Sequence, residues 1–136
     1  MEPQNQQRFF TERDLKETIE RLFNSVCEAF ARSDAAGAAI YFSDRPEMLK
    51  ISNGNVLNGK EQMIAYWEKK IKDLNGMAIT IHINALHRIN DDYLWMVADE
   101  YISSPNSQTK AVFTNLLIWE DNQWKILLDH TTYLNP

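Results

Sequence analysis

The stretch that decides the fold is KAVFTNLLIWEDNQWKILLDHTTY, residues 110–133. Two runs rich in β-branched and aromatic residues flank the dipeptide Asp121-Asn122, and a short polar break between such runs predicts an antiparallel hairpin. Two similar runs precede it, at residues 78–89 and 93–103, and short polar connections separate them. The second half of the chain is therefore predicted to be a meander of four antiparallel strands.

The first half of the chain is predicted to be helical apart from one hairpin. Thr11 has the character of an N-cap, and the apolar residues that follow recur at helical spacing over about five or six turns. A short second helix comes next, and Asn53-Gly54 between short apolar runs predicts a type I′ hairpin before a third helix. Helices first and strands second indicate an α+β fold with the helices on one face of a curved sheet.

Composition limits the classes of partner. The 136 residues carry a net charge of −5, and their basic residues are scattered among acids, which argues against nucleic acid and anionic membranes. No apolar run approaches the ~18 residues that span a bilayer, and no signal peptide is evident, so a cytoplasmic protein is expected. Residues 1–10 are predicted to form a flexible arm, and residues 11–136 a single domain.

The order of these elements resembles the nuclear transport factor 2-like superfamily, and within it the SnoaL-like (polyketide cyclase-like) branch. The most specific segments are NGKEQMIAYW at 58–67 and WKILLDHTT at 124–132. The resemblance implies a cystatin-like cone, in which a curved antiparallel sheet wraps around the long N-terminal helix and encloses a pocket. Isomerases, cyclases, dehydratases, epoxide hydrolases and non-catalytic dimerisation modules share this fold, so the fold alone does not assign a reaction.

The catalytic sets of two enzyme branches are not evident in this sequence. The tyrosine, the aspartate base and the second acid of the ketosteroid isomerases would fall near Val26, Ser52-Asn53 and Ala111, which lack the required groups. The Asp-Arg-Asp set of the epoxide hydrolases is also missing, because no arginine follows Arg88.

The register of the strands can be predicted from their turns. A two-residue hairpin at 121–122 and a turn centred near Asn106 would place Asp99 and His130 on either side of Phe113, on one face. That face is aromatic with a few polar groups, as in ligand pockets. The predicted pocket is lined by Trp67, Trp95, Asp99, Tyr101, Phe113, Asn115, Trp119 and His130.

Asp99 and His130 are the candidate catalytic pair, acting as general acid and base in isomerase-, cyclase- or lyase-type chemistry on a small organic ligand. A histidine titrates near neutral pH, and a nearby carboxylate can fix its tautomer. Two alternatives stay open, namely that both side chains serve only the structure, or that the chain is a non-catalytic ligand-binding or dimerisation module. Neither a metal nor a cofactor is expected, since His82 and His87 lie five apart in one strand and so point to opposite faces.

The opposite face of the predicted sheet is largely apolar. It would present Leu94, Met96, Ala98, Ile102, Val112, Leu116, Ile118 and Leu127. A monomer rarely exposes so much apolar surface, so the pattern predicts a homodimer through this outer face, as the resemblance also implies.

Overall fold

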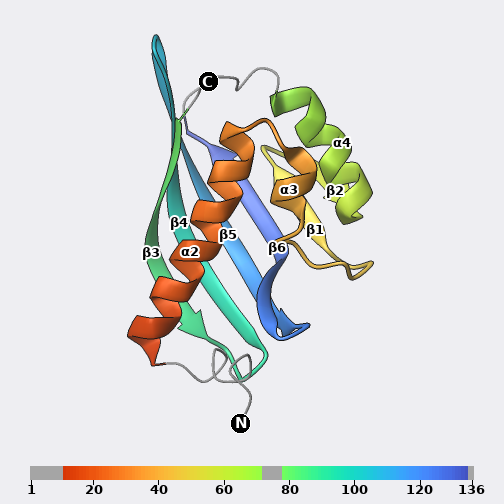
Figure 1. Cartoon of the computed structure of the whole chain (residues 1–136), viewed down its shortest axis with the longest axis vertical. Coiled ribbons are helices and arrows are strands. Elements are labelled where there is room, and N and C mark those ends of the chain that lie inside the picture. The colour runs from red at the N-terminus through yellow and green to blue at the C-terminus, as the bar shows by residue number, and fades with distance from the viewer. Residues whose placement is uncertain (1–10, 72–77, 135–136) are drawn as a thin grey trace.

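The structure, a computed structural model, describes residues 11–71 and 78–134 and confirms the α+β class (Figure 1). Its helices are α2 (Glu12–Ala31), α3 (Ala35–Ala39) and α4 (Gly59–Ile71). Its strands are β1 (Leu49–Ser52), β2 (Asn55–Asn58), β3 (Ala78–Arg88), β4 (Tyr93–Ser104), β5 (Ser107–Glu120) and β6 (Gln123–Tyr133). The predicted arm at residues 1–10 lies outside the described residues.

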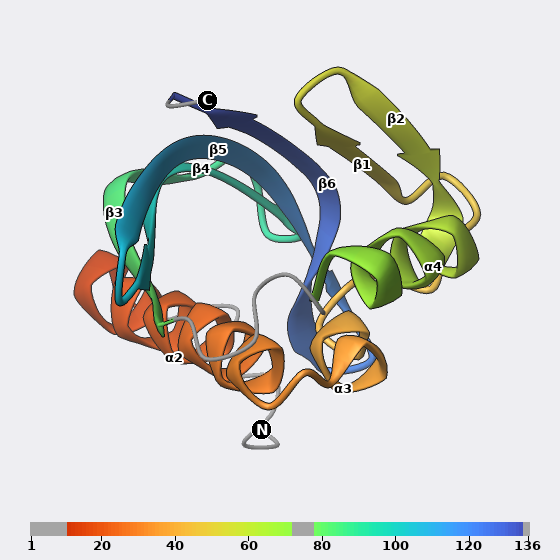
Figure 2. The same cartoon turned by 90° about the horizontal axis from the view of Figure 1, so that it is seen from above.

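One curved sheet organises the fold. Its strand order is β2-β1-β6-β5-β4-β3, and neighbours are antiparallel except for the parallel pair β1–β6. Strands β3 to β6 form the predicted meander and bend into an arc, with α2 across its open side (Figure 2). Helices α3 and α4 lie beside the β1–β2 end of the sheet. The sheet is an open cone and not a closed barrel, because β2 and β3 are its two edges and do not pair with each other.

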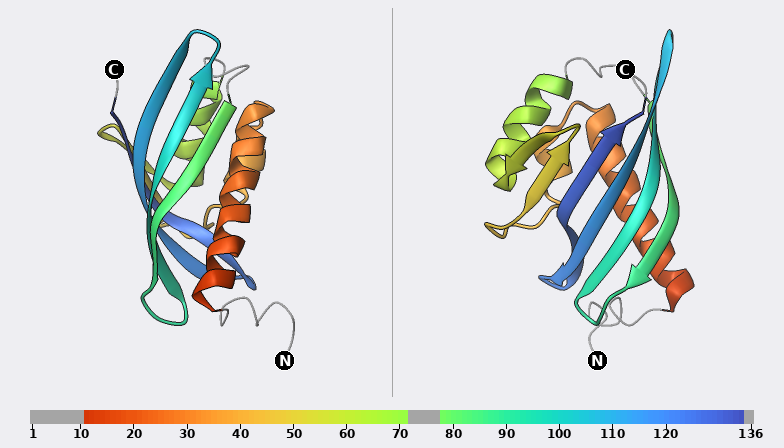
Figure 3. Two further views of the ribbon diagram at one scale, coloured as in Figure 1. Left: turned by 90° about the vertical axis from the view of Figure 1, so that its left-hand side faces the viewer. Right: turned by 180° about the vertical axis from the view of Figure 1, so that it is seen from behind.

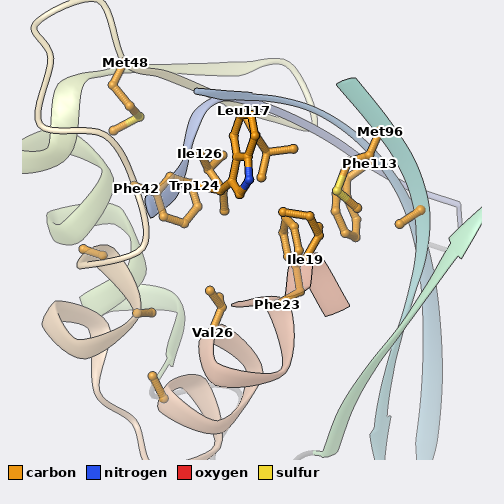
Figure 4. Close-up of a cluster of buried hydrophobic side chains, with 14 of the residues drawn as sticks. Ile19, Phe23, Val26, Phe42, Met48, Met96, Phe113, Leu117, Trp124 and Ile126 are labelled. Atoms are coloured by element: carbon orange, nitrogen blue, oxygen red, sulfur yellow. The ribbon is translucent and has the colours of Figure 1, made fainter. Parts of the chain in front are cut away.

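Helix α2 supplies one wall of the interior. Thr11 caps it, because the Thr11 hydroxyl oxygen accepts a hydrogen bond from the backbone N–H of Asp14 at 3.3 Å. The apolar stripe predicted from the sequence is buried, with Ile19, Phe23 and Val26 pointing toward the sheet (Figure 4). The helix runs along the concave face only, and no described helix covers the opposite face of strands β3 to β6 (Figure 3).

The predicted type I′ hairpin at Asn53-Gly54 and the predicted two-residue hairpin at 121–122 are both present. Asp121 and Asn122 have φ of 53° and 60°, and Asn53 has a φ of 50°. Positive φ at these central positions matches the twist of the flanking strands. The 121–122 turn places Trp119 opposite Trp124, with their ring centroids 5.3 Å apart.

The predicted register of β4 was wrong by one residue. Ser104 pairs with Ser107, so the turn is closed by Pro105-Asn106, and Ala98 rather than Asp99 lies opposite Phe113. Because side chains alternate along a strand, a slip of one residue moves every side chain of β4 to the other face.

A β-bulge on β6 caused the second register error. Leu117 pairs with Ile126, as the two-residue hairpin at 121–122 requires, whereas Leu116 pairs with Leu128, which leaves Leu127 as an extra residue. The bulge reverses the facing of the residues that follow it. Thr131, and not His130, therefore lies opposite Phe113.

These two corrections also revise the predicted outer face. Leu94, Met96 and Ala98 are buried in the core with Phe113, and Ile102 faces the interior too. Trp95 is 38% exposed and lies on the outer face instead. The homodimer through the outer face stays a prediction.

No helix in the described part of the chain is long and apolar enough to cross a membrane. The cytoplasmic location and the single-domain boundary at residue 11 stay predictions from the sequence.

Candidate functional site

A cavity of about 340 Å³ lies between the helices and the concave face of the sheet. Its walls are mainly apolar, with Phe23, Val26 and Phe30 from α2, Trp67 from α4 and Phe113 from β5. Small-molecule sites have this size and this kind of wall. The cavity is therefore the candidate functional site.

Aromatic contacts hold these walls in place. The Trp67 ring meets Phe30 edge-on with 4.8 Å between centroids, and it meets Phe42 in the same way at 5.2 Å. Phe23 and Phe113 join α2 to β5 with centroids 5.5 Å apart. Edge-to-face pairs are favoured by the charge distribution of the rings and order the side chains that make them.

One polar group of the cavity is a buried ion pair. The parallel pairing of β1 with β6 puts Lys50 opposite Asp129 and Ser52 opposite Thr131. The Lys50 Nζ lies 3.3 Å from the Asp129 Oδ2, and the Thr131 hydroxyl donates a hydrogen bond to the Asp129 Oδ1 at 2.7 Å. All four side chains line the cavity, and Asp129 already has two partners.

Glu100 is the other charged group that β4 brings into the cavity. Its carboxyl makes no hydrogen bond or ion pair with residues 11–71 or 78–134. Burial raises the pKa of Glu100 to about 7, the positive charge of Lys50 opposes the rise, and the negative charge of Asp129 adds to it. Glu100 is thus an acid that can gain or lose a proton near neutral pH, inside a mainly apolar cavity.

Two further titratable groups near Glu100 remain neutral at pH 7. Burial raises the pKa of the Cys27 thiol to about 12, and the charge of Glu100 adds to this. Burial also raises the pKa of Tyr133, while its hydrogen bond with Ser52 opposes the rise. Cys27 is therefore a poor nucleophile, because the thiolate is the reactive form.

The predicted catalytic pair does not lie in the cavity. Asp99 points to the outer face of β4, where its carboxylate is 3.8 Å from the Lys110 Nζ. His130 is exposed and pairs across the sheet with Thr114. Asp99 faces outward because the observed register of β4 differs by one residue from the predicted one. His130 faces outward because the bulge at Leu127 reverses the facing of the residues after it.

The six predicted ligand-binding residues divide into three groups. Trp67 and Phe113 line the cavity. Asn115 and Trp119 are buried on the inner face outside the lining, whereas Trp95 and Tyr101 belong to the outer face because of the same slip on β4. Asn115 is 1% exposed, and its side-chain amide makes no hydrogen bond within the described residues.

Lys50, Glu100 and Asp129 were the polar groups that sequence reasoning missed. Glu100 had a usable signal, because it shares the spacing of Leu94, Met96 and Ala98, the more uniformly apolar set of β4. Lys50 had none, since it comes near Asp129 only through the parallel pairing of two segments far apart in the chain.

The described residues, 11–71 and 78–134, contain no group of three or more histidine, cysteine or acidic side chains placed to hold a metal ion. His87 instead stacks on Trp95, with ring centroids 4.6 Å apart.

Comparison with known proteins agrees with this architecture. A family model described as a SnoaL-like domain matches residues 19–135, and the chain therefore belongs to the family of SnoaL-like domains. A comparison with curated protein sequences gave no match.

Solved structures share the fold at low sequence identity. A nuclear transport factor 2-like protein of unknown function from Shewanella oneidensis is 22% identical, with a TM-score of 0.78, covering 87% of this chain and 98% of that one. A cystatin-like protein of unknown function from Nostoc punctiforme is 14% identical, with a TM-score of 0.79 over 93% and 95%. A ketosteroid isomerase-like protein from Erwinia carotovora atroseptica is 14% identical, with a TM-score of 0.73 over 93% and 100%. At these identities the likeness shows the fold alone.

Proposed function

We propose that the chain binds a small, mainly apolar organic molecule in the cavity, and that Glu100 is the polar group that contacts it and exchanges a proton with it. The observation that carries this proposal is that Glu100, among aromatic walls, has no hydrogen-bond or ion-pair partner within residues 11–71 and 78–134. Glu100 is half-buried. A fully buried polar group without a hydrogen bond costs about 1–3 kcal/mol, and a ligand that bonds to the Glu100 carboxyl recovers the part of that cost that half-burial imposes.

The Lys50–Asp129 pair has a different role from Glu100. Its charges neutralise each other at 3.3 Å, and Thr131 satisfies a further lone pair of the carboxylate. The pair therefore gives the floor of the cavity a fixed dipole, while Glu100 remains free to respond to a ligand.

Catalysis of an isomerase or lyase type is the second candidate for the same site. A carboxyl group with a pKa of about 7 suits general acid–base work at neutral pH. Glu100 is the cross-strand partner of Ala111, the position where the resemblance expected the late-strand acid of a ketosteroid isomerase. The similar structure from Erwinia carotovora is described as ketosteroid isomerase-like, which is the same class of reaction.

Blocking the cavity tests binding directly. Thr109 lines the cavity, so we expect Thr109→Trp to weaken binding of a neutral aromatic probe such as 2-naphthol by at least about tenfold, measured by quenching of tryptophan emission. Thr80→Trp is the matched control, because Thr80 is exposed on the outer face of β3, where it pairs with Tyr101. This variant should bind the probe as the unmutated chain does.

Equal binding by both variants would contradict the proposed site. The same assay separates the two candidate functions when compounds are followed by mass spectrometry. A compound that is converted makes the site catalytic, and Glu100→Gln should then abolish conversion while binding persists.

A further inference from the structure

Among the described residues, and leaving aside the exposed Lys70, the charges that line the cavity do not cancel. Two carboxyl groups, Glu100 and Asp129, face one enclosed ammonium group, that of Lys50. Lys50 is committed to Asp129 at 3.3 Å, and both side chains are at most 10% exposed. Within residues 11–71 and 78–134, the enclosed group that has no ion-pair partner is therefore the acid Glu100, and a partner for it would be positively charged.

We infer that the cavity selects a small apolar molecule carrying one basic nitrogen, and that its ammonium group pairs with the carboxylate of Glu100. This inference rests on the proposed function and names the ligand class for that site. An ammonium group would supply the counter-ion that the described chain lacks.

The walls of the cavity suit a cation as well. Aromatic rings attract cations through the negative potential of their faces. The cavity already shows one such contact, because the Lys50 Nζ lies 5.9 Å from the centroid of the Trp67 ring. A ligand with an apolar body and an ammonium group would meet aromatic side chains and a carboxylate together.

An anionic ligand fits the same surroundings less well. Lys50 is already paired, and the remaining lysine of the lining, Lys70, is exposed and stands 5.7 Å from the Tyr66 ring. Solvent screens the exposed charge of Lys70, so it attracts an anion only weakly. An anionic ligand enclosed beside Glu100 and Asp129 would be repelled strongly by their negative charges. The chain's net charge of −5 also favours the approach of cations.

The proton balance of binding gives the inference a signature. The groups that act on Glu100 are Lys50 from β1 and Asp129 from β6, with the neutral Tyr133 of β6 and Cys27 of α2 nearby. When an ammonium ion binds to the chain while Glu100 is protonated, the Glu100 carboxyl releases one proton to the solvent and then pairs with the ammonium as a carboxylate. Amine affinity should therefore rise about tenfold between pH 6 and pH 8, across the pKa of Glu100 of about 7.

Three probes of one shape test this: 3-phenylpropylamine, 3-phenylpropan-1-ol and 3-phenylpropanoate, titrated calorimetrically near pH 6 and near pH 8. We expect the amine to bind at least about tenfold more tightly than the other two near pH 8. Near pH 6, titrations in two buffers of different ionisation enthalpy should show that close to one proton is released per amine bound.

Glu100→Gln should remove the preference for the amine and its pH dependence, and should retain binding of the alcohol. Asp99→Asn is the matched control, because Asp99 is the adjacent acid in the chain and faces outward, so this variant should keep both properties. If Glu100→Gln fails to fold, proton release by the unmutated chain still decides the question.

The outcomes separate this inference from the proposed function. If the alcohol binds as tightly as the amine near pH 8, and Thr109→Trp abolishes this binding, the inference is overturned and the proposed function stands. Binding of the propanoate more tightly than the amine would likewise overturn the inference and leave the proposed function standing. Absence of binding by all three probes overturns both.

Discussion

Replacing Lys50 with methionine is expected to lower the free energy of unfolding by about 3–5 kcal/mol. Methionine keeps much of the length and the apolar stem of lysine and removes the charge. Asp129 would then be a carboxylate in a 7% exposed residue, with the Thr131 hydroxyl as its remaining hydrogen-bond partner. Losing one member of a buried ion pair is costly because the other member cannot recover its hydration. Urea denaturation at neutral pH measures the change.

Two further variants make this measurement specific. The double change Lys50→Met with Asp129→Leu should recover most of the loss, because no charge is then left unpaired. Lys60→Met is the matched control, since Lys60 pairs with Asp44, whose side chain is 71% exposed, and exposed pairs contribute about 0–1 kcal/mol. A loss below about 1 kcal/mol for Lys50→Met would show that water reaches Asp129 freely.

The second large effect is on the pH dependence of stability. Folding raises the pKa of Glu100 from 4.5 to about 7, so between these values the folded chain holds a proton that the unfolded chain has lost. The stability supplied by Glu100 is fully present below pH 4.5, and it falls as the pH rises toward 7 and above. One pKa unit corresponds to about 1.4 kcal/mol, so the total change is about 3 kcal/mol.

Glu100→Gln isolates this contribution, because glutamine does not titrate. We expect the variant to gain about 3 kcal/mol relative to the unmutated chain between pH 4.5 and pH 8, or a relative shift in Tm of roughly 10 °C. Thermal unfolding of both proteins across this range measures the difference, with Asp99→Asn as the control on the outer face. A constant difference between Glu100→Gln and the unmutated chain would contradict the burial of Glu100.

Much of the fold was predictable because it is encoded locally. Thr11 caps α2, apolar residues at helical spacing form its buried face, and Asn53 and Asp121 mark hairpins through positive φ. Each signal lies within a few residues of the element that it predicts. The parallel pairing of β1 with β6 has no such local signal, since it joins residues 49–52 to residues 128–131.

The candidate site was less predictable because it depends on register. Strand side chains alternate, so the pairing set by the turn at Pro105-Asn106, which differs by one residue from the predicted pairing, decides whether Asp99 or Glu100 faces the interior. The bulge at Leu127 likewise determines that Asp129 and Thr131, and not His130, face the interior. A polar residue near a strand end was a sound indication of a pocket wall, but it did not identify which residue of the run faces inward.

The central claim is that Glu100 faces the cavity as an acid that titrates near neutral pH. A pH titration of its side-chain carboxyl ¹³C resonance tests this most directly, with assignment by comparison with Glu100→Gln. We expect a midpoint near pH 7, set by burial beside the Lys50–Asp129 pair. A midpoint near 4.5 would contradict the account, because it would place the carboxyl in water.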